Sequence, residues 1–179
     1  MFVLGIDPGL SRCGYGCIEA HRLGPRMIAL GVVRTAASCP LPQRLAELQL
    51  ELRALIAELS PDVVAVERVF FQTNVRTAMS VGQASGLAMA EASNAGCEVV
   101  QYSPNEVKLA VAGDGRAGKG EMQRMVQVLL GLVSVPRPPD AADAAALALC
   151  HLAHAPMQRR VDAATAPSTA RSPARSTVR

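Results

Sequence analysis

Residues 2–9, FVLGIDPG, form a short run of strand-favouring apolar residues that stops at the turn-forming pair Pro8-Gly9. This run predicts a strand that ends at Asp7. Two further β-like runs, at 14–20 and 27–34, are separated by the turn sequence LGPR. Together the three runs predict an antiparallel meander with Asp7 at the carboxyl end of its first strand.

The rest of the chain alternates helical and strand patterns. Leucines and an isoleucine recur every three or four positions over 41–59, which predicts an amphipathic helix. Strands are expected at 62–67, which ends at Glu67, and at 97–102. Helices are expected at 74–95, from 104 to about 112, from about 120 to 130, and from about 140 onward. This order predicts an α/β fold with a five-stranded mixed sheet, in which parallel crossover strands extend the meander and helices flank the sheet.

Length and composition predict one folded domain. The chain has 179 residues, of which 50% are hydrophobic and 18% are charged. We expect one folded domain over 1–156 and a disordered tail over 157–179, because the tail is rich in Ala, Pro, Ser and Arg. The net charge is +3, and the arginine-rich tail accounts for more than all of it. A nucleic-acid partner would therefore need a local basic patch in the domain.

Cysteine usage and hydropathy indicate the compartment. The five cysteines are odd in number and include no CxxC pair, which favours a reducing cytoplasm. No apolar run reaches the roughly 20 residues that a membrane-spanning helix needs, so no membrane partner is expected.

Four carboxylates are expected at one edge of the sheet. Asp7 and Glu67 end strands that the topology places side by side, and Asp140 and Asp143 lie in the first turn of the last helix. Each of them alone is compatible with a structural role at a turn or helix end. Together they would repel one another without a hard cation, so they predict Mg²⁺, with Mn²⁺ as a substitute. Two such ions in one active site suit phosphodiester hydrolysis.

The sequence resembles the RuvC-type Holliday-junction resolvases, which have a ribonuclease H-like fold. The resemblance covers about residues 1–155 and rests on motifs in the family's order: GIDPG at 5–9, VVAVERVFFQTN at 63–74, GQASG at 82–86, YSPNEVK at 102–108, GDGRAGK at 113–119 and PPDAADAAALALCH at 138–151. It implies a metal-dependent homodimeric endonuclease that makes paired, symmetric nicks in four-way DNA junctions during recombination and repair. It also implies a RuvA–RuvB branch-migration complex as a partner.

The resemblance assigns roles to individual residues. The family's acidic positions, which are catalytic and bind the metal, fall on Asp7, Glu67, Asp140 and Asp143. Its DNA-contacting aromatic residue falls on Phe70, and its two DNA-facing lysines fall on Lys108 and Lys119. We also expect DNA contacts from Arg76 and Arg116. The chain departs from the family in Arg68, where glutamine is common, and in the glycines on either side of Lys119.

The glycine-rich segment 113–119 also matches the pattern of a nucleotide-binding loop. That loop follows a strand and ends in GK[ST], whereas this segment follows a predicted helix and Gly120 stands where Ser or Thr would bind Mg²⁺. We therefore interpret it as a DNA-contacting loop. A phosphate-loop ATPase remains a third-ranked alternative.

Small residues recur every four positions in the helix predicted over 74–95, at Ala78, Gly82, Gly86 and Ala90. The stripe allows close approach of another backbone. It could pack against the chain's own sheet, or it could pair with its copy across the twofold axis of a homodimer.

Two other functions also stay open: a ribonuclease H-like nuclease that acts on RNA, and a junction-binding module without catalysis.

Overall fold

A computed structural model of the protein describes residues 1–69 and 75–165. Its strands are β1 (Phe2–Asp7), β2 (Arg12–His21), β3 (Gly24–Arg34), β4 (Val63–Glu67) and β5 (Glu98–Tyr102). Its helices are α1 (Leu41–Leu59), α2 (Val75–Asn94), α3 (Pro104–Ala112), α4 (Lys119–Leu129) and α5 (Pro139–Thr165). This is the element order that the sequence predicts.

The strands form one mixed sheet in the order β3-β2-β1-β4-β5. β1 pairs antiparallel with β2, and β2 with β3. On its other side β1 pairs parallel with β4, and β4 with β5. β1 is therefore central, and the predicted five-stranded mixed sheet is confirmed.

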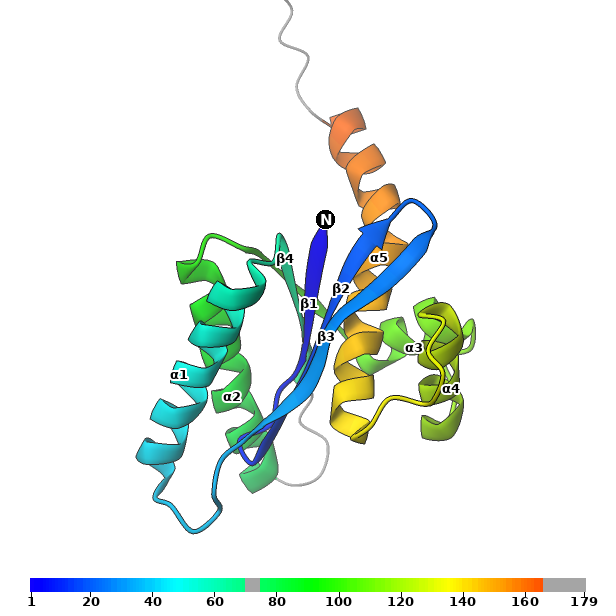
Figure 1. The fold of residues 1–179 in the computed structure, drawn as a ribbon. Coiled ribbons are helices and arrows are strands. Elements are labelled where there is room, and N and C mark those ends of the chain that lie inside the picture. Colours follow the sequence, from blue (N-terminus) through cyan, green and yellow to red (C-terminus); the bar gives the residue numbers. More distant parts are fainter. Residues whose placement is uncertain (70–74, 166–179) are drawn as a thin grey trace, which may run out of the picture.

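Helices cover both faces of the sheet. α1 and α2 lie on one face, and α3, α4 and α5 lie on the other (Figure 1). Two buried cores fill the space between these layers. Leu4 and Ile6 of β1 belong to the core under α1 and α2, whereas Val3 belongs to the core under α5. The side chains of β1 thus alternate between the two cores.

The hairpin between β2 and β3 is longer than the sequence predicts. The chain turns at Arg22 and Leu23, and β3 already begins at Gly24, where φ is 121°. The prediction placed Pro25 in the turn formed by residues 23–26. Proline lacks the backbone N–H that pairs strands. β3 is an edge strand, where a missing donor costs little, so Pro25 lies inside the strand.

The last helix passes the domain boundary that the sequence places at residue 156. α5 continues to Thr165, and residues 166–179 of the predicted tail lie outside the described residues. Within the described part of the chain, no helix is both long enough and apolar enough to cross a membrane.

Candidate active site

Asp7 and Glu67 lie on the same face of the sheet, at the ends of neighbouring parallel strands. Val3 of β1 and both Val63 and Ala65 of β4 pack into the core under α5. Because strand side chains alternate between faces, Asp7 and Glu67 continue these rows on the α5 side. The carboxyl ends of parallel strands are where ligands bind in α/β folds. The predicted pairing of the two carboxylates at this edge agrees with the structure.

The first turns of α5 bring a third carboxylate to this edge. Asp143 lies with Asp7 and Glu67 around a cavity of about 230 Å³. Residues of α3, α4 and α5, two of them lysines, complete the lining: Pro104, Val107, Lys108, Lys119, Met122, Ala146 and Leu147. Three acids and two bases therefore share one partly apolar cavity.

Burial and neighbouring negative charge both act on the carboxylates of the site, and burial is the larger effect. Burial, and then the charges of Glu67, Asp143 and Asp140, raise the pKa of Asp7 to about 7, although Lys119 opposes this rise. Burial and the charge of Asp143 also raise the pKa of Glu67. Asp7 and Glu67 are therefore held in a partly buried, negatively charged environment that disfavours their ionised forms.

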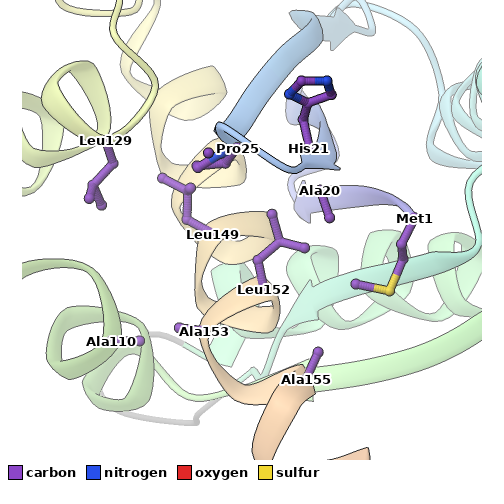
Figure 2. A pocket seen from close by; sticks show the side chains of 11 residues that line it. Met1, Ala20, His21, Pro25, Ala110, Leu129, Leu149, Leu152, Ala153 and Ala155 are labelled. Atoms are coloured by element: carbon purple, nitrogen blue, oxygen red, sulfur yellow. The ribbon is translucent and has the colours of Figure 1, made fainter.

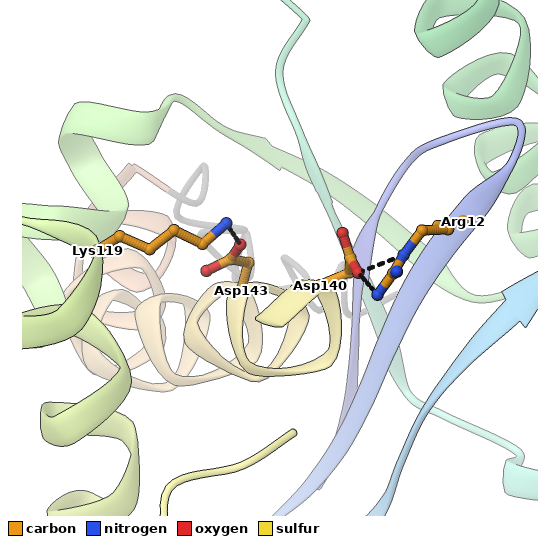
Figure 3. Close-up of polar contacts among 4 residues, drawn as sticks. All are labelled: Arg12, Lys119, Asp140 and Asp143. Carbon is orange, nitrogen blue, oxygen red and sulfur yellow. Dashed lines mark hydrogen bonds and ion pairs between the residues drawn. The ribbon is translucent and has the colours of Figure 1, made fainter. Parts of the chain in front are cut away.

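Two ion pairs neutralise part of this charge. Lys119 Nζ lies 3.0 Å from Oδ2 of Asp143, and Arg12 Nε donates to Oδ2 of Asp140 at 2.8 Å. Figure 3 shows the two pairs side by side on α5, with Lys119 and Arg12 approaching from opposite directions. Asp140 lies close enough to raise the pKa of Asp7, but its carboxylate is bonded to Arg12.

The predicted convergence of four carboxylates is therefore incomplete. Among the described residues, no three His, Cys, Asp or Glu side chains are gathered closely enough to hold a metal ion. The physical reason is that Asp140 and Asp143 each take a basic side chain as counterion. The donor set still fits a hard cation, because it consists of carboxylate oxygens, and two of them, on Asp7 and Glu67, are partly buried beside other acids.

The residues expected to contact DNA lie in different places: two line the cavity, one lies in a nearby loop, and the side chains of the other two are not described. Lys108 and Lys119 line the cavity, and Lys119 remains 63% exposed. Arg116 is exposed in the loop before α4, where its backbone N–H donates to Asp114. Phe70 lies outside the described residues, and for Arg76 only its place in the first turn of α2 is described.

The small-residue stripe of α2 faces solvent. Gly82, Gly86 and Ala90 are exposed, and a Cβ atom added at either glycine would meet nothing within 4 Å. The buried face of α2 is formed instead by Ala84, Ala88 and Ala92. Packing of the stripe against the chain's own sheet, one of the two predicted alternatives, is therefore wrong.

Sequence reasoning missed two contacts around the site. Arg12 was not singled out because its partner is 128 residues away. Tyr102 was not singled out either, although it pairs with Glu67 across β4 and β5 and its hydroxyl lies 2.9 Å from Nδ1 of the buried His151. The sequence did contain a signal for Tyr102. It ends its strand as Asp7 and Glu67 end theirs, so it lies in the same row across the sheet.

A larger cavity lies elsewhere on the molecule. It has a volume of about 750 Å³ and is formed between the β2–β3 hairpin, α3, α4 and α5 (Figure 2). Its lining is mostly apolar, with Met1, Leu129, Leu149 and Leu152 among its residues and His21 as its one titratable side chain. It contains no acid that could bind a hard cation, so the smaller cavity is the candidate active site.

Comparison with known proteins agrees with this geometry. The family model described as crossover junction endodeoxyribonuclease RuvC matches residues 3–151. The chain belongs to the RuvC family. The RuvC match runs from β1 into α5 and contains all four carboxylates of the site.

RuvC relatives cover nearly the whole chain. The RuvC of Salinispora arenicola is 53% identical over 165 residues, which are 92% of this chain and 94% of that protein. The RuvC of Chloroflexus aggregans is 49% identical over 160 residues, 89% of this chain and 98% of that protein. A solved structure of Thermus thermophilus RuvC in complex with Holliday junction substrate has a TM-score of 0.83 at 38% identity and covers 88% of this chain and 96% of that one. The expected RuvC fold is thereby confirmed.

Proposed function

We propose that the protein is a metal-dependent endonuclease that resolves four-way DNA junctions by paired nicks. The observation that carries this proposal is the cavity shared by Asp7, Glu67 and Asp143 at the carboxyl ends of β1 and β4. It occurs in a chain that matches RuvC proteins over most of its length, one of which was solved with a Holliday junction. The family match and the carboxylate cavity point to the same chemistry.

Asp7, Glu67, Asp140 and Asp143 are the residues that would hold the metal. We propose Mg²⁺, with Mn²⁺ as a substitute, and two ions in each active site. Bound there, the metal would activate water and stabilise the charge that develops on the phosphate. Burial and the neighbouring acids raise the pKa of Asp7 to about 7, so a bound cation would favour its ionised form.

The basic residues at the rim would bind the DNA backbone. Lys119 is exposed next to Asp143, and Lys108 lines the same cavity, so both ammonium groups can reach a phosphate that approaches the carboxylates. Arg116 and Arg76 are proposed to hold flanking phosphates. Phe70 is proposed to stack on an unpaired base at the junction centre.

A C2 homodimer would match the two equivalent strands of the junction. The stripe of Ala78, Gly82, Gly86 and Ala90, of which the last three are exposed, supports α2 as the interface, because small side chains allow two helices to approach closely. Met79 beside it is 59% exposed and would become buried in such a pair. The RuvA–RuvB complex is proposed as the partner, and the free thiols of all five cysteines support a reducing cytoplasm.

Two other functions make different predictions. A ribonuclease of the same fold would cut an RNA–DNA hybrid better than a junction. A junction-binding module would bind the junction but would not cleave it. The carboxylate cavity favours a nuclease over a binding module, and the family match favours junctions over hybrids.

The decisive experiment compares three substrates: a labelled four-way junction, a linear duplex and an RNA–DNA hybrid. Each is incubated with the full chain in Mg²⁺, in Mn²⁺ and in chelator. We expect symmetric nicks in the junction that require the metal. Asp7→Asn should abolish cleavage and retain junction binding, whereas Glu51→Gln on the exposed face of α1 should behave as wild type. Preferred cleavage of the hybrid, or cleavage by Asp7→Asn, would contradict the proposal.

A further inference from the structure

Arg12 connects the start of β2 to the start of α5. Its Nε and Nη2 atoms both donate to Oδ2 of Asp140, as the two dashed lines in Figure 3 show. The Arg12 side chain is 42% exposed and that of Asp140 is 28% exposed. The contact therefore forms at the mouth of the site, where solvent and a ligand can reach it.

The pair has a counterpart on the other side of the site. Lys119 binds Asp143 as Arg12 binds Asp140, and both cations are more exposed than the carboxylates that they neutralise. Partly exposed ion pairs contribute little to stability, so their partners exchange easily. A guanidinium group can bind a phosphate through two N–H groups, just as it binds a carboxylate.

We propose that Arg12 is a positioning residue that holds Asp140 away from the metal site until a DNA phosphate replaces the carboxylate as its partner. Once Arg12 has moved to the phosphate, Asp140 loses its counterion beside Asp7, whose pKa it already raises. The site then gains affinity for a cation. By linkage, a cation that occupies the site also strengthens DNA binding. This inference rests on the proposed function and adds to it an order of assembly, in which DNA completes the metal site.

Arg34 provides a matched control for the charge of Arg12. It is exposed on β3, directly opposite Arg12 in the register of β2 and β3. Arg34→Gln therefore removes the same charge from the same edge of the molecule without breaking the contact with Asp140. Any effect of Arg12→Gln beyond that of Arg34→Gln reports on the contact itself.

The test measures Mn²⁺ binding to the free full-length protein by titration calorimetry, and junction binding in chelator over a range of salt. We expect Arg12→Gln to bind Mn²⁺ about three- to tenfold more tightly than Arg34→Gln, because Asp140 is released. We also expect its junction binding to weaken and the magnitude of its salt slope to fall by about one unit. Arg34→Gln should stay close to wild type in Mn²⁺ binding.

Three results would overturn the inference: equal Mn²⁺ affinity in the two variants, weaker Mn²⁺ binding by Arg12→Gln, or junction binding and salt slope equal to those of Arg34→Gln. Failure of the proposed function would look different. The wild-type protein would then neither bind Mn²⁺ nor cut the junction. A wild type that does both, with Arg12→Gln matching Arg34→Gln, refutes only the role of Arg12.

Discussion

Gly5 of β1 and Ala144 of α5 are in backbone contact, because a Cβ atom on Gly5 would overlap the carbonyl oxygen of Ala144. Gly14 and Gly16 of β2 also lie against the backbone of α5, where an added Cβ would meet Asp140 and Ala145 respectively. The helix meets these glycines with fully buried alanines: Ala141, Ala144, Ala145 and Ala148. α5 thus lies directly on the sheet, and this close packing brings its aspartates near Asp7.

Gly5→Ala should destabilise the protein by at least about 2 kcal/mol. Overpacking a core costs about 1–3 kcal/mol, and here the obstructing atoms belong to the backbone, which cannot move aside like a side chain. Urea denaturation measures the loss. Gly120→Ala in α4 is the control, because its added Cβ meets nothing within 4 Å and alanine favours a helix. Equal midpoints for the two variants would refute the close contact.

The element order was predictable from the sequence, but this packing was not. Hydrophobic periodicity and turn residues act locally, so they placed β1, β4 and α1 correctly. The approach of α5 depends on which glycines face which helix, and that is settled only when the sheet is assembled. The alternation Gly14-Tyr15-Gly16 beside an alanine-rich helix was the signal available in the sequence.

Asp7→Asn should stabilise the metal-free protein at pH 8. The pKa of Asp7 is raised to about 7 in the folded state, against an ordinary value of 3.8 in the unfolded chain. Between these two values the folded state retains a proton that the unfolded chain has lost. The wild type therefore loses stability as the pH rises from about 4 to 7, and asparagine does not. We expect an advantage of at least about 1 kcal/mol for the variant above pH 7 and none below pH 4.

Thermal melting in chelator from pH 4 to pH 8 measures this difference. Addition of Mg²⁺ at pH 8 should raise the melting temperature of the wild type more than that of Asp7→Asn, because the variant has lost one proposed ligand. Glu51→Gln serves as the control for the loss of a surface carboxylate. A variant that is less stable than the wild type at pH 8 would show that Asp7 is not held among uncompensated charges.

Glu91→Gln should weaken the packing of α2 on α1. Glu91 is 4% exposed and accepts hydrogen bonds from Gln49 and Arg53 of α1, with Arg53 Nε at 2.8 Å. These hydrogen bonds lower the pKa of Glu91 to about 2. Loss of the charge should cost about 1–3 kcal/mol at pH 7, measured by urea denaturation.

The contribution of Glu91 to stability depends on pH with the opposite sign to that of Asp7. The stabilisation by Glu91 is complete above pH 4.5, the pKa of this group in the unfolded chain. It is lost as the pH falls through about 2, its pKa in the folded state. The gap between wild type and Glu91→Gln should therefore close between pH 5 and pH 2. Glu47→Gln, an exposed position of the same α1, should show no such gap. A gap that stays constant with pH would mean that Glu91 acts by shape alone.

The acids of the site were easier to predict than its cations. Asp7 and Glu67 end strands, and strand ends can be read from the sequence. Lys119 was expected to face DNA, but its 3.0 Å contact with Asp143 depends on how α4 packs beside α5. The partner of a long basic side chain depends on which elements pack beside it in the folded protein, so local sequence patterns do not specify that partner.

Lys119→Ala should lower both cleavage and the salt dependence of junction binding. Each lost phosphate contact reduces the magnitude of the salt slope by about one unit. Lys108→Ala should act likewise, since both lysines line the cavity. Junction binding at several salt concentrations in chelator, with cleavage assayed separately, measures both effects. An unchanged slope and unchanged cleavage in both variants would leave them as ordinary surface lysines.

Replacement of Gly82 and Gly86 by Leu should convert a dimer into monomers that bind junction DNA poorly. Both positions are open in the single chain, so the new side chains clash only with a partner helix. The melting temperature of the separated chain should not fall, because leucine favours a helix over glycine. Sedimentation gives the mass, and Ala46→Leu on the exposed face of α1 is the control. A double variant that keeps the mass of a dimer would place the interface elsewhere, and a monomeric wild type would refute the homodimer itself.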